Sequence, residues 1–129
     1  MQTHSRRQKD SNFITTKALH TTLANSNSFD LGQVAGGLVE DVQVEIISPA
    51  DVATTGTICT YKLQDSADNS TFADVDPSVS TSITAASSAL AAKTVEFPLP
   101  PVTRRYIRIQ QTGNTLGAVA GTFTVSLLF

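Results

Sequence analysis

Residue types that carry most enzyme and metal chemistry are scarce in this sequence. Its 129 residues include no Trp, one Cys and two His. A lone cysteine cannot close an internal disulfide, so we expect Cys59 to be a small apolar side chain inside a strand. The two histidines, His4 and His20, lie in or near a polar N-terminal segment, and no His/Cys pair has the spacing of zinc ligands. We therefore predict no metal site.

The same shortage bears on catalysis. A Ser-His-Asp or Cys-His arrangement would need one of these histidines, and no nucleophile-elbow motif accompanies either of them. The glycines Gly32, Gly36 and Gly37 do not have the spacing of a phosphate-binding fingerprint. We predict that the protein is not an enzyme and that it binds no cofactor.

Charged residues are also few, and they are unevenly distributed. They make up 16% of the chain, and the formal net charge of −2 argues against a nucleic-acid partner, which requires a basic excess. Residues 1–20 carry a net charge of +3, residues 21–103 carry −8, and residues 104–129 carry +3. A basic segment ahead of an acidic body indicates a docking arm, and the alternative is a solvated, poorly ordered terminus. We predict two units, a basic arm at residues 1–20 and a folded domain at residues 21–129.

No segment has the properties of an export signal or a membrane span. The first twenty residues lack the apolar core of a signal peptide. Residues 109–129 are uncharged and long enough to span a bilayer, but they include Gln, Asn and Gly residues that hydrocarbon disfavours. We expect a protein that is made and folded in a reducing cytoplasm and has no membrane partner.

Thr and Ser are abundant, and apolar residues recur at every second position. The 18 Thr and 13 Ser together outnumber all charged residues. Residues 39–47, 57–64 and 121–129 alternate apolar and polar side chains, which is the period of a strand with one wet face. The residues predicted to face inward on these strands are Val42, Val44, Ile46, Cys59, Tyr61, Leu63, Phe123, Val125, Leu127 and Phe129.

The segments between these strands are dominated by turn-forming residues. Residues 65–70 contain Asp, Asn and Ser, whose side chains bond their own backbone, so we predict a hairpin turn. The spacing of an EF-hand calcium loop is absent there. Residues 78–92 form a Ser/Thr/Ala tract that leaves two alternatives open: a strand near residues 79–83 followed by a loop, or a short helix near residues 85–92.

The C-terminal third completes the strand pattern. Prolines in and after residues 94–99 confine that strand to a sheet edge or a strand end. Residues 105–111 alternate with Ile107 and Ile109 inward, and residues 112–114 predict a turn. Seven or eight short strands without a long helix predict an all-β fold, a jelly roll or two-sheet antiparallel β-sandwich.

Three arginines lie close together near the start of the predicted strand at residues 105–111. Arg104, Arg105 and Arg108 leave two interpretations open. They form either a patch that binds anions or salt bridges to the acidic body of the domain.

Several segments resemble a known family. Residues 61–75, YKLQDSADNSTFADV, resemble the central motif of small capsid cement, or decoration, proteins of tailed phages. Residues 99–101, 105–109 and 120–125 resemble the C-terminal half of the same proteins, and residues 28–32 resemble their first strand.

This resemblance covers about residues 28–129 and implies a jelly-roll protein bound to the outer surface of an icosahedral capsid. It implies a homotrimer that bridges adjacent capsomers and whose partner is the phage major capsid protein. It also implies synthesis in the cytoplasm of the bacterial host. We expect the basic arm to touch a neighbour, and its removal to leave the fold intact. The candidate contact residues are Arg6, Arg7, Lys9, Lys17 and Arg104.

The same motifs are also similar to discoidin-type carbohydrate-binding modules. Those modules share the hairpin of residues 61–75 and the Arg-Tyr-Ile-Arg-Ile strand of residues 105–109. This chain lacks the paired cysteines and the exposed aromatic platform of that family. Because of these differences, we take a carbohydrate-binding or adhesion module as the alternative function rather than the main one.

Overall fold

The computed structural model describes residues 9–18, 23–32, 42–49, 51–76, 78–84, 89–90, 92–116 and 122–128. All regular structure in these residues is β-strand, as the alternating pattern predicted. The strands are β1 (Lys9–Ala18), β2 (Leu23–Asn25), β3 (Phe29–Asp30), β4 (Gln43–Ser48), β5 (Asp51–Ser66), β6 (Ala73–Asp74), β7 (Ser80–Thr84), β8 (Ala89–Leu90), β9 (Lys93–Pro98), β10 (Tyr106–Leu116) and β11 (Thr122–Leu128).

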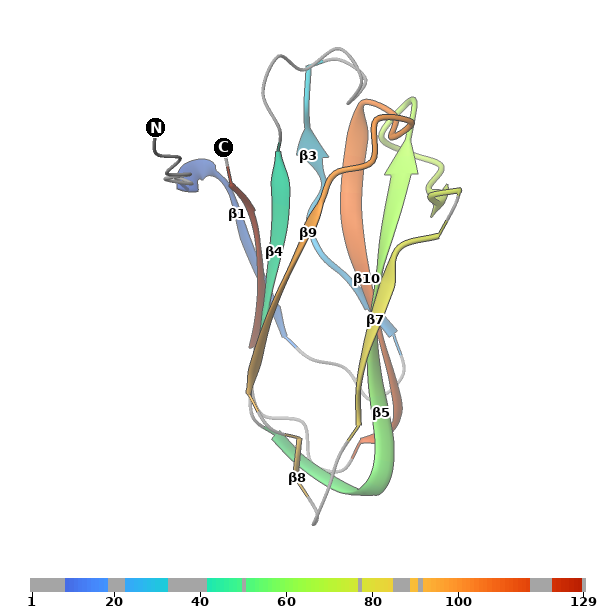
Figure 1. The fold of residues 1–129 in the computed structure, drawn as a ribbon. Helices are drawn as coiled ribbons and strands as arrows, with labels where there is room; N and C mark the ends of the chain where they lie inside the picture. Colours follow the sequence, from blue (N-terminus) through green and yellow to red (C-terminus); the bar gives the residue numbers. More distant parts are fainter. Residues whose placement is uncertain are drawn as a thin grey trace, which may run out of the picture.

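The strands form two antiparallel sheets that face each other (Figure 1). The four-stranded sheet has the order β1-β11-β4-β9. In the seven-stranded sheet, β2 pairs with β10, β10 with β5, and β5 with β7, while β3 adds to β10 and both β6 and β8 add to β5. The chain crosses between the sheets before β2, β4, β5, β9, β10 and β11, and the resulting strand orders, β1-β11-β4-β9 facing β2-β10-β5-β7, are those of a jelly roll. The predicted fold class is confirmed.

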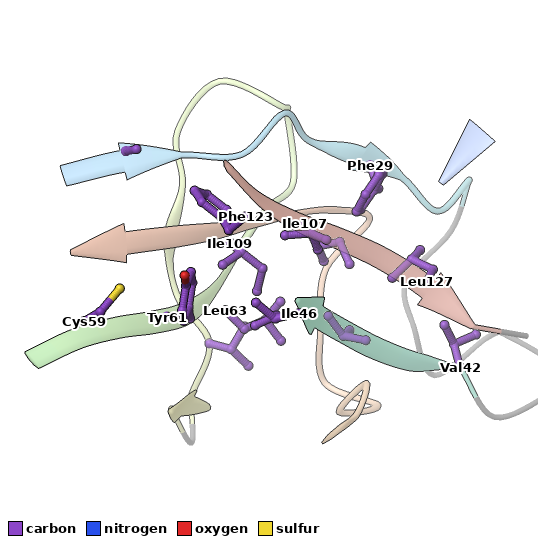
Figure 2. Close-up of a cluster of buried hydrophobic side chains, with 14 residues drawn as sticks. Phe29, Val42, Ile46, Cys59, Tyr61, Leu63, Ile107, Ile109, Phe123 and Leu127 are labelled. Carbon is purple, nitrogen blue, oxygen red and sulfur yellow. The ribbon is translucent and has the colours of Figure 1, made fainter. Parts of the chain in front are cut away.

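Side chains from both sheets fill the space between them. Val44 and Ile46 of β4, and Leu63 of β5, are at most 1% exposed, in agreement with their predicted inward positions. Cys59 is also buried, as expected. Burial of a large apolar side chain contributes roughly 1.5–3 kcal/mol, so this core is the main source of stability. Figure 2 shows the cluster; its members are Ala24, Phe29, Val42, Val44, Ile46, Cys59, Tyr61, Leu63, Val75, Ile107, Ile109, Phe123, Val125 and Leu127.

Tyr61 links the two sheets by two different contacts. Its ring, from β5, meets Phe123 of β11 edge-on, with 5.3 Å between the ring centroids. Its hydroxyl lies 2.7 Å from the Ser48 hydroxyl of β4, inside the core. Burial raises the pKa of Tyr61 far above its usual value, because the phenolate would lose its hydration. The neutral hydroxyl therefore holds a buried polar contact between the layers.

The four-stranded sheet begins inside the predicted basic arm. Lys9–Ala18 is strand β1, the edge strand next to β11, with Thr16 opposite Thr124 in the register. Residues 9–18 of the predicted arm thus pair with β11 as part of this sheet. Residues 13–23 alternate only weakly, in keeping with an edge strand, which buries little: Thr15 is buried, while Ile14 is 40% exposed.

The structure also tests the predictions for two further segments, residues 112–114 and residues 78–92. The turn predicted at residues 112–114 is wrong, because β10 continues there and pairs with β5 as far as Leu116. Of the two alternatives for residues 78–92, the strand is confirmed as β7, and the helix is wrong because Ala89–Leu90 pairs with β5 as β8. The β9 strand lies at a sheet edge, as its prolines predicted. The predicted core residue Phe129 lies outside the described residues.

Within the described residues, no helix has the length and apolar character that a membrane span requires.

Replacing Tyr61 with Phe should lower the free energy of unfolding by about 1 kcal/mol, because the buried Ser48 hydroxyl loses its partner while the ring contact with Phe123 remains. Urea unfolding measures this change. The double variant Ser48→Ala with Tyr61→Phe removes both groups and should lose less than the sum of the two single losses. Unchanged stability of Y61F would show that the contact contributes nothing.

Candidate interaction surface

Three segments that are distant in sequence meet at one end of the sandwich. They are residues 30–32 after β3, residues 65–71 at the end of β5, and residues 99–105 between β9 and β10, and we refer to them together as the loop end (Figure 1). Backbone bonds hold the surroundings in place: the Leu31 amide donates to the Arg105 carbonyl at 2.9 Å. The loop end contains most of the ion pairs found among the described residues.

Arg104 binds Asp65 through both its backbone and its side chain. The Arg104 amide donates to Asp65 Oδ2 at 2.9 Å, and Nε and Nη2 donate to Oδ1 at 3.1 and 2.8 Å. Nη2 also donates to the Asp65 carbonyl oxygen at 3.1 Å. The Asp65 carboxylate is almost fully buried, so these bonds replace its lost hydration. The hydrogen bonds from Arg104 to Asp65 raise the pKa of the guanidinium, and the clamp ties the β9–β10 connection to β5.

The turn just before Arg104 presents an apolar side chain to solvent. The Thr103 amide donates to the Pro100 carbonyl at 3.1 Å, which closes the turn. Val102, at its tip, is 61% exposed, the most exposed large apolar residue in the part of the chain that the structure describes. The clamp below it therefore holds an exposed apolar tip in a fixed position.

Arg105 makes a second ion pair, on the outer side of the loop end. Its Nε and Nη2 donate to Oδ1 and Oδ2 of Asp30 at 2.7 and 3.0 Å. Asp30 Oδ1 also accepts the Gly32 amide at 2.8 Å, where Gly32 has a φ of 77°. The Arg105 hydrogen bond and then the Gly32 amide lower the pKa of Asp30. Both charged side chains are about half exposed, so this pair orders the loop more than it stabilises the fold.

The predicted hairpin turn after β5 is confirmed and is organised by Asp68. Its Oδ1 accepts the Ser66 hydroxyl at 2.8 Å and the amides of Ser70 and Thr71 at 2.9 and 3.0 Å. Asn69 has the positive φ of 59° that Asn tolerates well, and its side chain accepts a 2.6 Å bond from the Ser28 hydroxyl. The Asp68 carboxylate is thus used by its own turn. Among the described residues, no group of three Asp, Glu, His or Cys side chains is placed to hold a metal.

The outer face of the seven-stranded sheet carries a connected row of polar side chains. Lys62 Nζ donates to Asp74 Oδ2 at 3.1 Å, and Gln64 Nε2 donates to Asp74 Oδ1 at 3.0 Å. Arg108 Nε donates to Gln64 Oε1 at 2.9 Å, and the Arg108 guanidinium packs on the ring of Phe72, 4.2 Å from its centroid. The row runs across β10, β5 and β6 and ends on the hairpin turn.

The five contact residues that the sequence predicts do not lie together in the structure. Arg6 and Arg7 lie outside the described residues. Lys9 and Lys17 are both on β1, where Lys17 is exposed and pairs in register with Phe123, far along the strand from the loop end. Arg104 is at the loop end, bound to Asp65. Of the two interpretations of the arginines, the salt bridge to the acidic body is therefore the one observed for Arg104 and Arg105.

Sequence reasoning missed the aromatic side chains at this surface. Phe72 lies beneath Arg108, and Tyr106 lies beneath Arg105, whose Cζ is 5.1 Å from its ring centroid. Tyr106 could have been found from the alternation at residues 105–111, because it shares the outward face with Arg108. Phe72 gave no such signal, because its position depends on the path of the hairpin turn.

The fold and this surface define a jelly-roll domain with a rigid, polar loop end. A model of the Bbp16 family matches residues 13–127, which span the strands from β1 to β11. The chain belongs to the Bbp16 family, a phage-associated family, and is a phage-related protein. No curated protein matches the sequence.

Replacing Asp65 with Asn should lower the free energy of unfolding by roughly 2 kcal/mol, because a buried, charge-assisted set of hydrogen bonds is lost. Asp30→Asn removes the same charge from the exposed Arg105 pair and should cost much less, because solvent screens that pair. Thermal or urea unfolding of the two variants gives the comparison. Equal losses would contradict the central role of the Asp65 clamp.

The Asp68 turn should respond to acid. The amides of Thr71 and Ser70, followed by the Ser66 hydroxyl, lower the pKa of Asp68 to about 2, whereas an unfolded Asp titrates near 3.9. Because the folded pKa is the lower one, the stabilisation is complete above about pH 4 and is lost as the pH falls toward 2. Carbon-detected NMR of the carboxyl group measures the midpoint. A midpoint near 4 would mean that these bonds do not hold the carboxylate in solution.

Proposed function

We propose that this protein binds the outer surface of an icosahedral phage head and stabilises the head by bridging neighbouring capsid subunits. One observation carries the proposal. Residues 61–75 and 105–109, which resemble segments of capsid cement proteins, lie side by side as β5, its turn, β6 and the start of β10. They supply one continuous surface at the loop end. Membership of a phage-associated family supports the same conclusion.

In the proposed mechanism, binding of this protein to the shell is thermodynamically linked to assembly of the shell. A protein that binds the assembled shell but not dispersed subunits stabilises the shell by mass action. We place the protein as a homotrimer at three-fold and quasi-three-fold positions, so that one trimer engages several capsid subunits at once. Simultaneous binding raises the effective concentration of each contact, so that modest individual contacts give firm attachment.

The loop end suits this role because its shape is set before binding. Arg104 with Asp65, and Arg105 with Asp30, join three segments across long sequence distances. A surface that is already ordered loses less conformational entropy on binding. The exposed Val102 tip supplies an apolar contact inside a polar rim, which is the usual composition of a protein interface.

The basic arm has a narrower role than its sequence indicates. β1 begins at Lys9, so Arg6 and Arg7 lie before the sheet, whereas Lys9 and Lys17 lie within it. We propose that these two arginines, with Lys9, reach an acidic patch on a capsid subunit or on a neighbouring copy. Lys17 belongs to the far part of β1 and serves a separate contact.

Purified heads of the parent phage that lack this protein provide the test. Added protein should co-sediment with these heads and raise the temperature at which they break open. Deletion of residues 1–8 should weaken the binding several-fold, most clearly at low salt, because surface charges are screened as salt rises. Deletion of residues 1–20 is not a suitable variant, since it removes β1 from the sheet.

Three results would count against the proposal in different ways. Failure of the intact protein to co-sediment at micromolar concentration would overturn capsid binding. A monomer in light scattering at that concentration would overturn the trimer. Saccharide binding on a glycan array without head binding would favour the carbohydrate-binding alternative.

A further inference from the structure

Arg108 occupies an unusual position on the outer face of the seven-stranded sheet. It is partly buried, and it contacts the ring of Phe72, 4.2 Å from the ring centroid, and the amide oxygen of Gln64 at 2.9 Å. Both partners are neutral. Burial removes water from the guanidinium and lowers the pKa of Arg108. A cation is thus partly dehydrated without a compensating negative charge.

The neighbouring cations differ from Arg108 in this respect. Arg104, Arg105 and Lys62 each have an aspartate within 3.1 Å. Among the residues that the structure describes, no carboxylate lies within ion-pair distance of Arg108. Asp74, the acid of the same polar row, already accepts bonds from Lys62 and Gln64. Arg108 therefore keeps an unmatched positive charge on an otherwise charge-paired surface.

The guanidinium is oriented for a planar acceptor. Its Nε is occupied by Gln64, while its two terminal nitrogens have no acceptor among the described residues. Contact with the Phe72 ring and the bond to Gln64 restrict the side chain, so less side-chain entropy remains to be lost on binding. A carboxylate can accept two parallel hydrogen bonds from the terminal nitrogens.

The surroundings of Arg108 are those of a protein-binding centre. Tyr106 and Gln110 share its outward face, opposite Ser66 and Lys62 on β5. Arg, Tyr and Phe are the residue types enriched at interfaces, and Arg and Tyr are frequent where single residues dominate the binding energy. One unmatched cation in an acidic body favours a single carboxylate over a polyanion, because nearby aspartates repel the remaining charges of a nucleic acid.

We infer that the surface formed by Arg108, Phe72, Gln64 and Tyr106 binds an aspartate or glutamate side chain of a partner protein. The partner is the capsid subunit, a step that rests on the proposed function. Arg108 donates two hydrogen bonds to the carboxylate, and the aromatic rings pack against the adjoining backbone. This places one specific contact beside the loop end.

A peptide titration tests the carboxylate site without using heads. The probe is Ac-Ala-Ala-Glu-Ala-Ala-amide, and its Gln counterpart is the control peptide. In NMR, the Glu peptide should shift the Arg108 side-chain N–H and the Phe72 ring signals, and the Gln peptide should not. The Phe72 shifts should vanish in Arg108→Gln and persist in Lys93→Gln, a matched loss of one positive charge on the exposed strand β9 of the other sheet. Equal shifts with both peptides, or with R108Q, would overturn the site.

Co-sedimentation with heads tests the partner. R108Q should bind heads about tenfold more weakly than the intact protein, and Arg108→Lys should recover only part of the loss, because Lys cannot stack or bond in the same plane. Lys93→Gln should bind within about twofold, and unfolding curves check that all three variants fold. If the intact protein fails to bind heads while the Glu peptide still shifts Arg108, the proposed function fails and the carboxylate site stands. If heads bind R108Q normally, the assignment of the capsid subunit to this site is wrong.

Discussion

The antiparallel pairing of β5 with β10 is the constraint on which both the core and the outer surface depend. It aligns Ile109 with Leu63 on the inner side and Arg108 with Gln64 on the outer side. A shift of one residue would exchange these two faces, exposing the isoleucine and burying the arginine. The same register therefore sets the apolar packing and the position of the polar groups that β10 and β5 contribute to the row on the outer face.

The two sheets are joined by contacts of different strength and purpose. Apolar packing supplies most of the stability, and the Tyr61–Ser48 hydroxyl contact adds a directional link between the layers. The Asp65–Arg104 clamp acts at the end of the sandwich and gains its importance from the burial of the carboxylate. The more exposed Arg105–Asp30 pair chiefly orders the loop after β3. Stability and surface rigidity thus come from separate sets of residues.

Alternation of apolar and polar residues was sufficient to predict the strands that bury one full face. Residues 42–46 and 59–63 have the inward positions that their period indicated. The same pattern is weak where little apolar surface is buried, as in β1, and the prediction failed where pairing overrides local turn propensity, as at residues 112–114 of β10. A Gly-Asn pair favours a turn in isolation, but each residue there has a β5 residue opposite it.

The candidate surface was less predictable because its members come from distant segments. The sequence by itself determined an all-β sandwich, a hairpin turn at residues 65–70, and a chain with few side chains for catalysis. It also showed that the arginines near residue 105 could pair with the acidic body, but not which aspartate each would meet. Only the tertiary structure decided that Arg104 binds Asp65, that Arg105 binds Asp30, and that Arg108 packs on Phe72 without an acidic partner among the described residues. The reason is physical: strand period is a local property of the chain, whereas charge pairing depends on the register between strands and on the path of the turns that connect them.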